Sequence, residues 1–287
     1  MTLKQQPAVW PITDIVIFDC DSTLSSVEGI DELARLTGQA SAVADLTRRA
    51  MDGEIPLENV YSYRLNTSNP NSSQVNDIWR IYRETVISDA VEVIAALQGA
   101  GCKVFIVSGG LIEPVRDFGV WLNVPREYIF AVDMEYDQLS GQWWRYWEQV
   151  GEQNPNANYL AVNDNPLAGT GGKNLIIDRI RSRYPGRAML VGDGLSDLEA
   201  AEHVDLFVGF GGAVIREVVE QEASVYISTP NLSPILPLAL GRLADRSQSR
   251  RVFRDGLRRI EQGEVKFREA LKRELLLKSI AAEKRTG

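Results

Sequence analysis

The chain is poor in histidine and cysteine. His203 is its only histidine, and Cys20 and Cys102 are its only cysteines. Histidine is the usual general base at neutral pH and, with cysteine, the main ligand of zinc. These scarcities exclude a multi-histidine zinc site, a thiolate metal cluster and a disulfide framework. A Ser-His-Asp triad would need His203, and no nucleophile-elbow sequence lies near it. We expect His203 on the surface, and catalysis by carboxylates, lysine or a hard metal ion held by oxygen.

Long hydrophobic runs are also missing, and no run is long enough to cross a bilayer. The first residues, MTLKQQPAVWPIT, lack the pattern of a signal peptide, so we expect a cytoplasmic protein without a membrane partner. Charge is unevenly distributed. Residues 242–287 hold 14 Lys/Arg and 7 Asp/Glu, whereas residues 1–241 hold 17 and 32, a net charge of −15. So acidic a body argues against nucleic acid as the main partner.

The stretch ITDIVIFDCDST organises the rest of the chain. Ile15 to Phe18 form a short apolar run, typical of a strand buried on both faces of a parallel sheet. Asp19, Asp21, Ser22 and Thr23 follow at once. Parallel sheets bind ligands beyond the carboxyl ends of their strands, so this pair of acids is placed for chemistry. A helix cap would also use such residues, but one cap needs only one of them.

Further apolar runs predict the rest of the sheet. They lie in GCKVFIVSGG, AMLVGDGLSD, DLFVGFGG and ASVYIST, with a helix, EVIAALQGAG, just before the first of them. Strands alternating with helices predict a doubly wound α/β core with a Rossmann-like parallel sheet. Residues 133–172 are less regular. Here we expect a hairpin with Gly141 in its turn, followed by a loop in NPNANYLAVNDNPLAGTGG.

The chain is expected to divide into three parts. Residues 25–86 have a helical pattern and are too long for a simple crossover, which predicts a cap subdomain inserted after the first strand. Residues 1–24 and 87–241 then form the core. Residues 242–287 form a basic helical extension that packs on the acidic body, with a homodimer contact as the alternative. One helical face of this extension would carry Phe253, Leu257, Ile260, Phe267, Leu271 and Leu275.

Polar residues follow three of the predicted strands: Asp19 and Asp21, then Ser108 with Gly109 and Gly110, then Asp193 and Asp197. Lys173 follows a second Gly-Gly pair. Phosphoryl transfer needs a nucleophile, an acid/base, a divalent metal, donors to phosphate oxygens and a cation. Aspartate is already ionised at pH 7, and Mg²⁺ prefers oxygen ligands.

Each part also has a structural explanation. Ser108-Gly-Gly could be only a tight turn, and Lys173 a surface charge. Ser196 to Glu199 fit a capping box. The occurrence of all these parts at successive strand ends favours chemistry.

FDCDST, VSGG, GGK and GDGLSD resemble the four motifs of the haloacid dehalogenase superfamily of phosphohydrolases. EGIDELARLTG, LTRRAMDGEIP, GTGGK, VGDGLSDLEA and FVGFGGAVIRE are similar to its phosphoserine phosphatase family. The resemblance runs from about Ile15 to Ile227. It is weak across residues 133–168 and absent from the basic extension, so the extension is expected to be dispensable for chemistry.

The resemblance implies a role for each matching residue. Asp19 would be the nucleophile that forms an aspartyl-phosphate, and Asp21 would protonate the leaving oxygen and then activate water. Mg²⁺ would be held by Asp19, the main-chain carbonyl of Asp21, and Asp193, with Asp197 orienting this shell. The phosphate would be bound by Ser108, the amide of Gly109, and Lys173.

The family's substrate residues match positions in the cap. Glu28 and Arg64 correspond to the residues for the ammonium and carboxylate of phosphoserine, although each would otherwise be read as a solvated helix charge. Arginine suits a carboxylate because its planar fork donates two hydrogen bonds. Met51 corresponds to a residue that packs on the substrate. Leu57, however, stands where the family has a phenylalanine.

The resemblance therefore implies a Mg²⁺-dependent hydrolase of a small phosphomonoester, with O-phospho-L-serine as the expected substrate in serine biosynthesis. One alternative keeps the chemistry but acts on another small phosphomonoester or transfers the phosphate to an alcohol. Another alternative is a phospho-accepting, receiver-like signalling module. Receivers lack both an acid at the position of Asp21 and an inserted helical cap, which argues against it.

Overall fold

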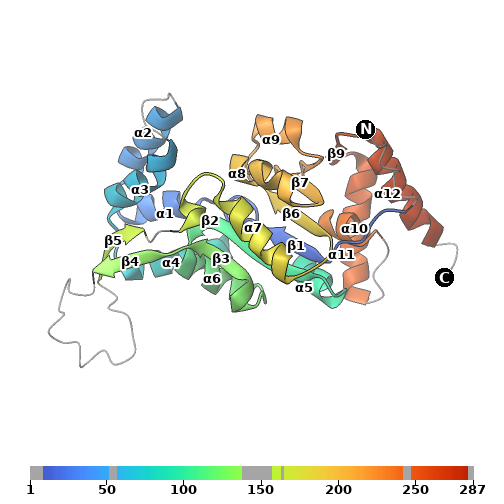
Figure 1. Cartoon of the computed structure of the whole chain (residues 1–287), viewed down its shortest axis with the longest axis horizontal. Helices are drawn as coiled ribbons and strands as arrows, with labels where there is room; N and C mark the ends of the chain where they lie inside the picture. Colours follow the sequence, from blue (N-terminus) through green and yellow to red (C-terminus); the bar gives the residue numbers. More distant parts are fainter. Residues whose placement is uncertain (1–8, 52–56, 138–156, 163–164, 242–246, 284–287) are drawn as a thin grey trace.

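A seven-stranded sheet forms the centre of the computed structural model, which describes residues 9–51, 57–137, 157–162, 165–241 and 247–283 (Figure 1). Its strand order is β3-β2-β1-β6-β7-β8-β9. All neighbours are parallel except β8 and β9. The strands are β1 (Ile15–Phe18), β2 (Lys103–Leu111), β3 (Ile129–Val132), β6 (Ala188–Gly192), β7 (Leu206–Phe210), β8 (Val225–Ile227) and β9 (Val265–Phe267). The doubly wound α/β prediction is confirmed.

Helices cover both faces of this sheet, because alternate strand residues point to opposite sides. Ile15 and Ile17 pack in one core cluster with α7 (Gly172–Arg183). Val16 and Phe18 pack in the other with α5 (Ala90–Gly99), α6 (Ile112–Trp121) and α10 (Ile235–Leu240). β1 is buried along its whole length, as its apolar run predicted. The short helices α8 (Leu195–Glu199) and α9 (Glu217–Glu222) follow β6 and β7.

Between β1 and α5 the described chain forms four helices: α1 (Gly29–Leu36), α2 (Ala40–Met51), α3 (Leu57–Ser68) and α4 (Ser72–Glu84). They leave and rejoin the core at one point, where Ser25 and Val86 form an antiparallel bridge. α4 packs on α6, with the rings of Tyr82 and Phe118 5.5 Å apart. The insert is therefore anchored to the core through its last helix, and α1 to α3 extend beyond the sheet edge (Figure 1).

A two-stranded antiparallel sheet, β4 (Met134–Asp137) with β5 (Asn158–Val162), lies beside the insert (Figure 1). The backbone amide of Tyr159 donates to the carbonyl of Pro70 (2.8 Å), which joins β5 to the end of α3. The prediction of a loop across residues 158–162 was wrong, because this alternating stretch finds a partner in β4. The predicted turn at Gly141 lies outside the described residues.

The C-terminal segment is built into the core. Helices α11 (Ser247–Gln262) and α12 (Ala270–Glu283) flank β9, and Phe253 and Ile260 are fully buried in the larger core cluster. Two residues of the predicted helical face do not lie on it. Phe267 belongs to β9, and Leu271 is 59% exposed.

The two ends of the described chain also meet. Trp10 is buried, and its indole N–H donates to the carbonyl of Leu238 (2.7 Å). Its backbone amide donates to the hydroxyl of Ser279 in α12 (2.8 Å). The C-terminal helices thereby hold the segment that leads into β1. None of the described helices has the length and apolar character that a membrane span requires.

Candidate active site

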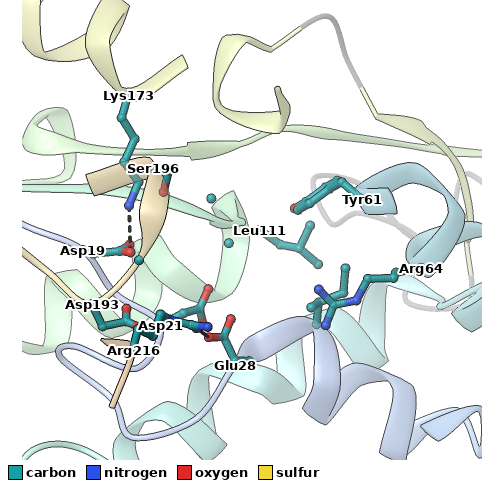
Figure 2. A pocket seen from close by; sticks show the side chains of 14 residues that line it. Asp19, Asp21, Glu28, Tyr61, Arg64, Leu111, Lys173, Asp193, Ser196 and Arg216 are labelled. Atoms are coloured by element: carbon teal, nitrogen blue, oxygen red, sulfur yellow. Dashed lines mark hydrogen bonds and ion pairs between the residues drawn. The ribbon is translucent and has the colours of Figure 1, made fainter. Parts of the chain in front are cut away.

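The carboxyl ends of β1, β2 and β6 meet at one edge of the sheet, where they line a cavity of about 190 Å³. Figure 2 shows Asp19, Lys173 and Asp193 on the core side of this cavity, and Tyr61 and Arg64 opposite them on the cap side. Sites for drug-sized ligands usually enclose about 300–1,000 Å³. The smaller volume fits a substrate of a few heavy atoms enclosed between core and cap.

Asp19 is held in one orientation by donors to both of its carboxylate oxygens. Lys173 donates to Oδ2 (2.7 Å), and the amide of Cys20 donates to Oδ1 (2.7 Å). Lys173 also donates to Oδ1 of Asp197 (2.6 Å), and the lysine side chain is only 5% exposed. The alternative explanation of Lys173, a surface charge, is therefore wrong.

The charges of this group stabilise one another. Burial alone would lower the pKa of Lys173, but Asp19 and Asp197 together raise it, so the lysine stays charged. Burial raises the pKa of Asp197, and Lys173 opposes that rise. The two acids and the lysine form one buried, hydrogen-bonded network.

Asp21 is positioned by two donors to a single oxygen. Its Oδ1 accepts from the hydroxyl of Tyr82 (2.6 Å) and from the amide of Gly29 at the start of α1 (2.8 Å). Burial raises the pKa of Asp21 to about 8; Glu28 adds to the rise, and Tyr82 opposes it. Among the described residues, Oδ2 accepts no hydrogen bond. A carboxyl group that is protonated near neutral pH and has one free oxygen is suited to general acid–base work.

The turn after β1 explains why the capping-only interpretation of this stretch was wrong. Ser22 adopts a left-handed backbone (φ 51°), and its hydroxyl donates to Glu28 (3.0 Å). α1 begins only at Gly29, and Glu28 at its N-cap makes no side-chain cap. Among the polar residues that follow β1 (Asp19, Asp21, Ser22 and Thr23), Asp21 alone binds an amide of α1.

Asp193 follows β6 and forms part of an acidic cluster. One carboxylate oxygen from each of Asp19, Asp193 and Asp197 lies within 4.8 Å of the others. All three residues are buried, and this set of hard oxygen donors fits a divalent cation such as Mg²⁺. Burial raises the pKa of Asp193 to about 6; Asp19 adds to the rise and Arg216 opposes it.

Two glycines allow the acids to approach the backbone. A methyl group on Gly192 would lie 2.2 Å from the Asp197 carboxyl carbon, and one on Gly110 would lie 2.9 Å from Oδ2 of Asp21. Asp197 caps α8 by accepting from the amide of Gly194 (3.1 Å). The predicted capping box from Ser196 was wrong in its register, since Gly194 is the N-cap and Ser196 instead lines the cavity.

Ser108 and Gly109 occupy the end of β2. Gly109 lines the cavity, whereas Ser108 is fully buried behind it and accepts from the amide of Gly110 (3.0 Å). The Ser-Gly-Gly sequence is thus the end of the strand itself.

The cap residues Glu28 and Arg64 both line the cavity, so the solvated-charge alternative does not describe them. Oε1 of Glu28 accepts from the guanidinium of Arg216 (3.1 Å). Arg64 pairs with Asp31 at the rim. Met51 is the last residue of α2, and its side chain lies outside the described residues. His203 lies away from the cavity, paired with Asp178 (2.8 Å).

Sequence reasoning missed Arg216, which bridges the core acids and the cap. Its Nε donates to Oδ2 of Asp193 (2.8 Å), and its terminal nitrogen reaches Glu28. FVGFGGAVIRE contains this arginine just past β7, so its position beyond a strand end was the available signal. Tyr61 and Tyr82 were missed as well, because they lie inside helices, where nothing in the local sequence separates them from packing residues. Ser196 was explained only as part of a capping box.

Comparisons with known proteins identify the family of the chain. Residues 13–125 match a family model described as haloacid dehalogenase-like hydrolase. A phosphoserine phosphatase from Rattus norvegicus is 33% identical over 217 residues, 75% of this chain and 89% of the rat protein. A chloroplastic phosphoserine phosphatase from Arabidopsis thaliana is 32% identical over 75% of this chain and 68% of its own length.

A solved structure shares the fold. The structure of a phosphoserine phosphohydrolase-like protein from Francisella tularensis superposes with a TM-score of 0.61, with 22% identity over 75% of this chain and 95% of that one. The family model matches residues 13–125, whereas the rat and plant relatives each match 75% of the chain at 32–33% identity. The chain belongs to the phosphoserine phosphatase family of haloacid dehalogenase-like hydrolases.

Proposed function

We propose that this phosphomonoester hydrolase converts O-phospho-L-serine to L-serine and phosphate with Mg²⁺ as its metal ion. The observation that carries the proposal is a small cavity that holds phosphoryl-transfer groups together with an acid and a base. Asp19, Asp21 and Lys173 line it, as do Glu28 and Arg64, and Arg64 lies on the side opposite Asp19 and Lys173 (Figure 2). Phosphoserine needs such an arrangement, since its ammonium and carboxylate lie at the end opposite its phosphate.

Asp19 is the proposed nucleophile. One of its carboxylate oxygens bonds to phosphorus while the bond from phosphorus to the serine oxygen breaks, which leaves an aspartyl-phosphate. The donors from Lys173 and Cys20 fix the carboxylate before attack, so little reorganisation is needed. The charge of Lys173 offsets the repulsion between carboxylate and phosphate.

Asp21 is the proposed acid and base. In the first step its carboxyl group gives a proton to the departing serine oxygen. In the second step the resulting carboxylate takes a proton from water, whose oxygen bonds to phosphorus and releases Asp19 and phosphate. Because Tyr82 and Gly29 occupy Oδ1, Oδ2 is the oxygen that faces this proton transfer.

We propose that Mg²⁺ is held by Asp19, the main-chain carbonyl of Asp21, and Asp193, with Asp197 orienting the shell. When bound, such an ion offsets the negative charge of the phosphoryl group. Lys173 and the amide of Gly194 hold Asp197 in place. Ser108 and Gly109 are the proposed phosphate donors.

Glu28 is the proposed partner of the substrate ammonium, and Arg64 of the carboxylate. The acidic body supports a small-molecule substrate over nucleic acid. Cys20 and Cys102 are unpaired and buried, as is usual in a reducing compartment, and they support a cytoplasmic enzyme. Pairing into a homodimer stays a prediction.

Phosphate release from a panel of small phosphomonoesters, with and without EDTA, tests the proposal. Phosphoserine should be the preferred substrate, and Mg²⁺ should restore activity after chelation. Asp19→Asn should fold normally and release no measurable phosphate, because the amide is isosteric but not nucleophilic. Asp19→Asn activity within about tenfold of wild type would remove the nucleophile assignment. A clear preference for another phosphomonoester would replace the substrate and keep the reaction.

A further inference from the structure

The hydroxyl of Tyr61 is a buried polar group at the cavity without a partner. Tyr61 lies in α3 and lines the cavity, and Figure 2 shows its ring pointing from α3 toward the cavity. Its oxygen makes no hydrogen bond within the described chain. Burial raises the pKa of Tyr61 well above its usual value, with Asp21 adding to the rise, so the phenol is neutral and keeps its proton. A buried phenol of this kind requires an acceptor.

Arg64 presents a second buried donor three residues further along α3. Its Nε is buried and unpartnered within the described chain, while its terminal nitrogen binds Asp31 at the rim. Residues three apart in a helix lie on the same face. Both side chains line the same cavity, so two unsatisfied donors from one helix face one space.

The charges around Tyr61 indicate what it can bind. Besides Arg64, the ionisable groups that act on its hydroxyl are Asp21, Glu113 and Tyr159. Arg64 is the cation among them, and it lines the same cavity as the hydroxyl. An anionic acceptor with two oxygens would satisfy Tyr61 and Arg64 together.

We propose that Tyr61 is a specificity-determining residue, whose hydroxyl donates a hydrogen bond to the substrate carboxylate that Arg64 also binds. The inference rests on the proposed function, since it takes phosphoserine as the substrate. It adds a second donor to that carboxylate, from a position that belongs to none of the sequence motifs.

The two parts of the Tyr61 side chain suit this role. The ring supplies apolar contact area at the cavity, and the hydroxyl adds a directional bond.

The test compares phosphoserine with phosphoethanolamine, which is the same phosphomonoester without the carboxylate. Tyr61→Phe keeps the ring and removes only the hydroxyl. We expect kcat/KM for phosphoserine to fall about 10- to 100-fold, mainly through KM, because a bond to a charged group is lost. The value for phosphoethanolamine should change less than about threefold, and inhibition by inorganic phosphate should be unchanged. Tyr63→Phe is the matched control, since Tyr63 lies on the same helix and is 44% exposed.

Each outcome decides between the two proposals. A selective loss in Tyr61→Phe, with Tyr63→Phe like wild type, supports the carboxylate contact. Equal losses on both substrates would overturn it, since the hydroxyl would then act on the phosphate or on Asp21. No loss on either, or the same loss in Tyr63→Phe, would overturn it as well. If wild type does not hydrolyse phosphoserine, the proposed function itself is wrong. If wild type does and the ratio of the two substrates stays constant in Tyr61→Phe, only the Tyr61 inference is wrong.

Discussion

Replacing Lys173 by methionine should destabilise the protein strongly, although it removes one side chain of similar length. Lys173 is 5% exposed and donates to Asp19 (2.7 Å) and Asp197 (2.6 Å). Without it, these two acids and Asp193 remain together in a buried cluster. Removing one partner of a buried ion pair typically costs about 3–5 kcal/mol, because the other charge stays buried. For a chain of this size that loss lowers the Tm by roughly 6–20 °C.

The loss should depend on pH in a defined direction. Burial already raises the pKa values of Asp193 and Asp197 in the folded protein, and Lys173→Met removes the lysine charge that opposes the rise at Asp197, so these values should lie further above the unfolded value of about 3.9. At pH values between the unfolded pKa and the raised folded pKa, the folded state binds more protons than the unfolded state. The free energy of unfolding therefore falls as pH rises through this range. The difference between wild type and variant should therefore be larger at pH 8 than at pH 5.

Chemical denaturation in metal-free buffer at both pH values measures this difference. Lys278→Met is the control for loss of a lysine, because Lys278 forms an exposed pair with Glu274 (2.6 Å), and its unfolding midpoint should not move. A loss below about 1 kcal/mol in Lys173→Met, or a larger loss at pH 5 than at pH 8, would refute the argument that Lys173 compensates buried acids.

Two further variants test other parts of the structure. Tyr82→Phe removes a donor that favours the charged form of Asp21, so the pKa of this acid should rise further. The alkaline limb of kcat/KM should then move upward by about 0.5–1 pH unit, and a downward shift would contradict the acid role. Phe253→Ala should lower the free energy of unfolding by about 3–5 kcal/mol because this side chain is fully buried, whereas kcat/KM of the folded protein should not change. A large fall in kcat/KM at a temperature where the variant is fully folded would mean that the C-terminal helices shape the cavity.

The core of the fold could be predicted because its signals are local. Ile15–Phe18 and Ala188–Gly192 are short apolar runs, and each is followed directly by acids that parallel pairing brings to one edge. β5 and β9 could not be predicted in this way. Neither is buried along its whole length as β1 and β6 are, and each pairs with a strand from another part of the sequence. Their strand character comes from the edge they pair with, and local propensity does not reveal that edge.

The same distinction applies to the site. Asp19, Asp193 and Lys173 stand at ends of predicted elements, so their meeting follows from topology. Tyr82 reaches Asp21 from the interior of α4, 61 positions away. That contact depends on how α4 packs against α6, and the sequence pattern of neither helix predicts this packing.

The contact between Trp10 and α12 determines when the N-terminal segment can fold during synthesis. Trp10 binds Ser279, 269 positions later, so the segment before β1 reaches its native place only when the last helix has emerged. At 5–20 residues per second, that wait lasts roughly 13–54 s. The edge of β8 also stays unpaired, for a shorter time, until β9 has been synthesised. A prematurely terminated chain would keep an open strand edge and an unburied tryptophan, the kinds of surface that promote aggregation and draw chaperones. Only a chain that extends through β9 and α12 can bury both.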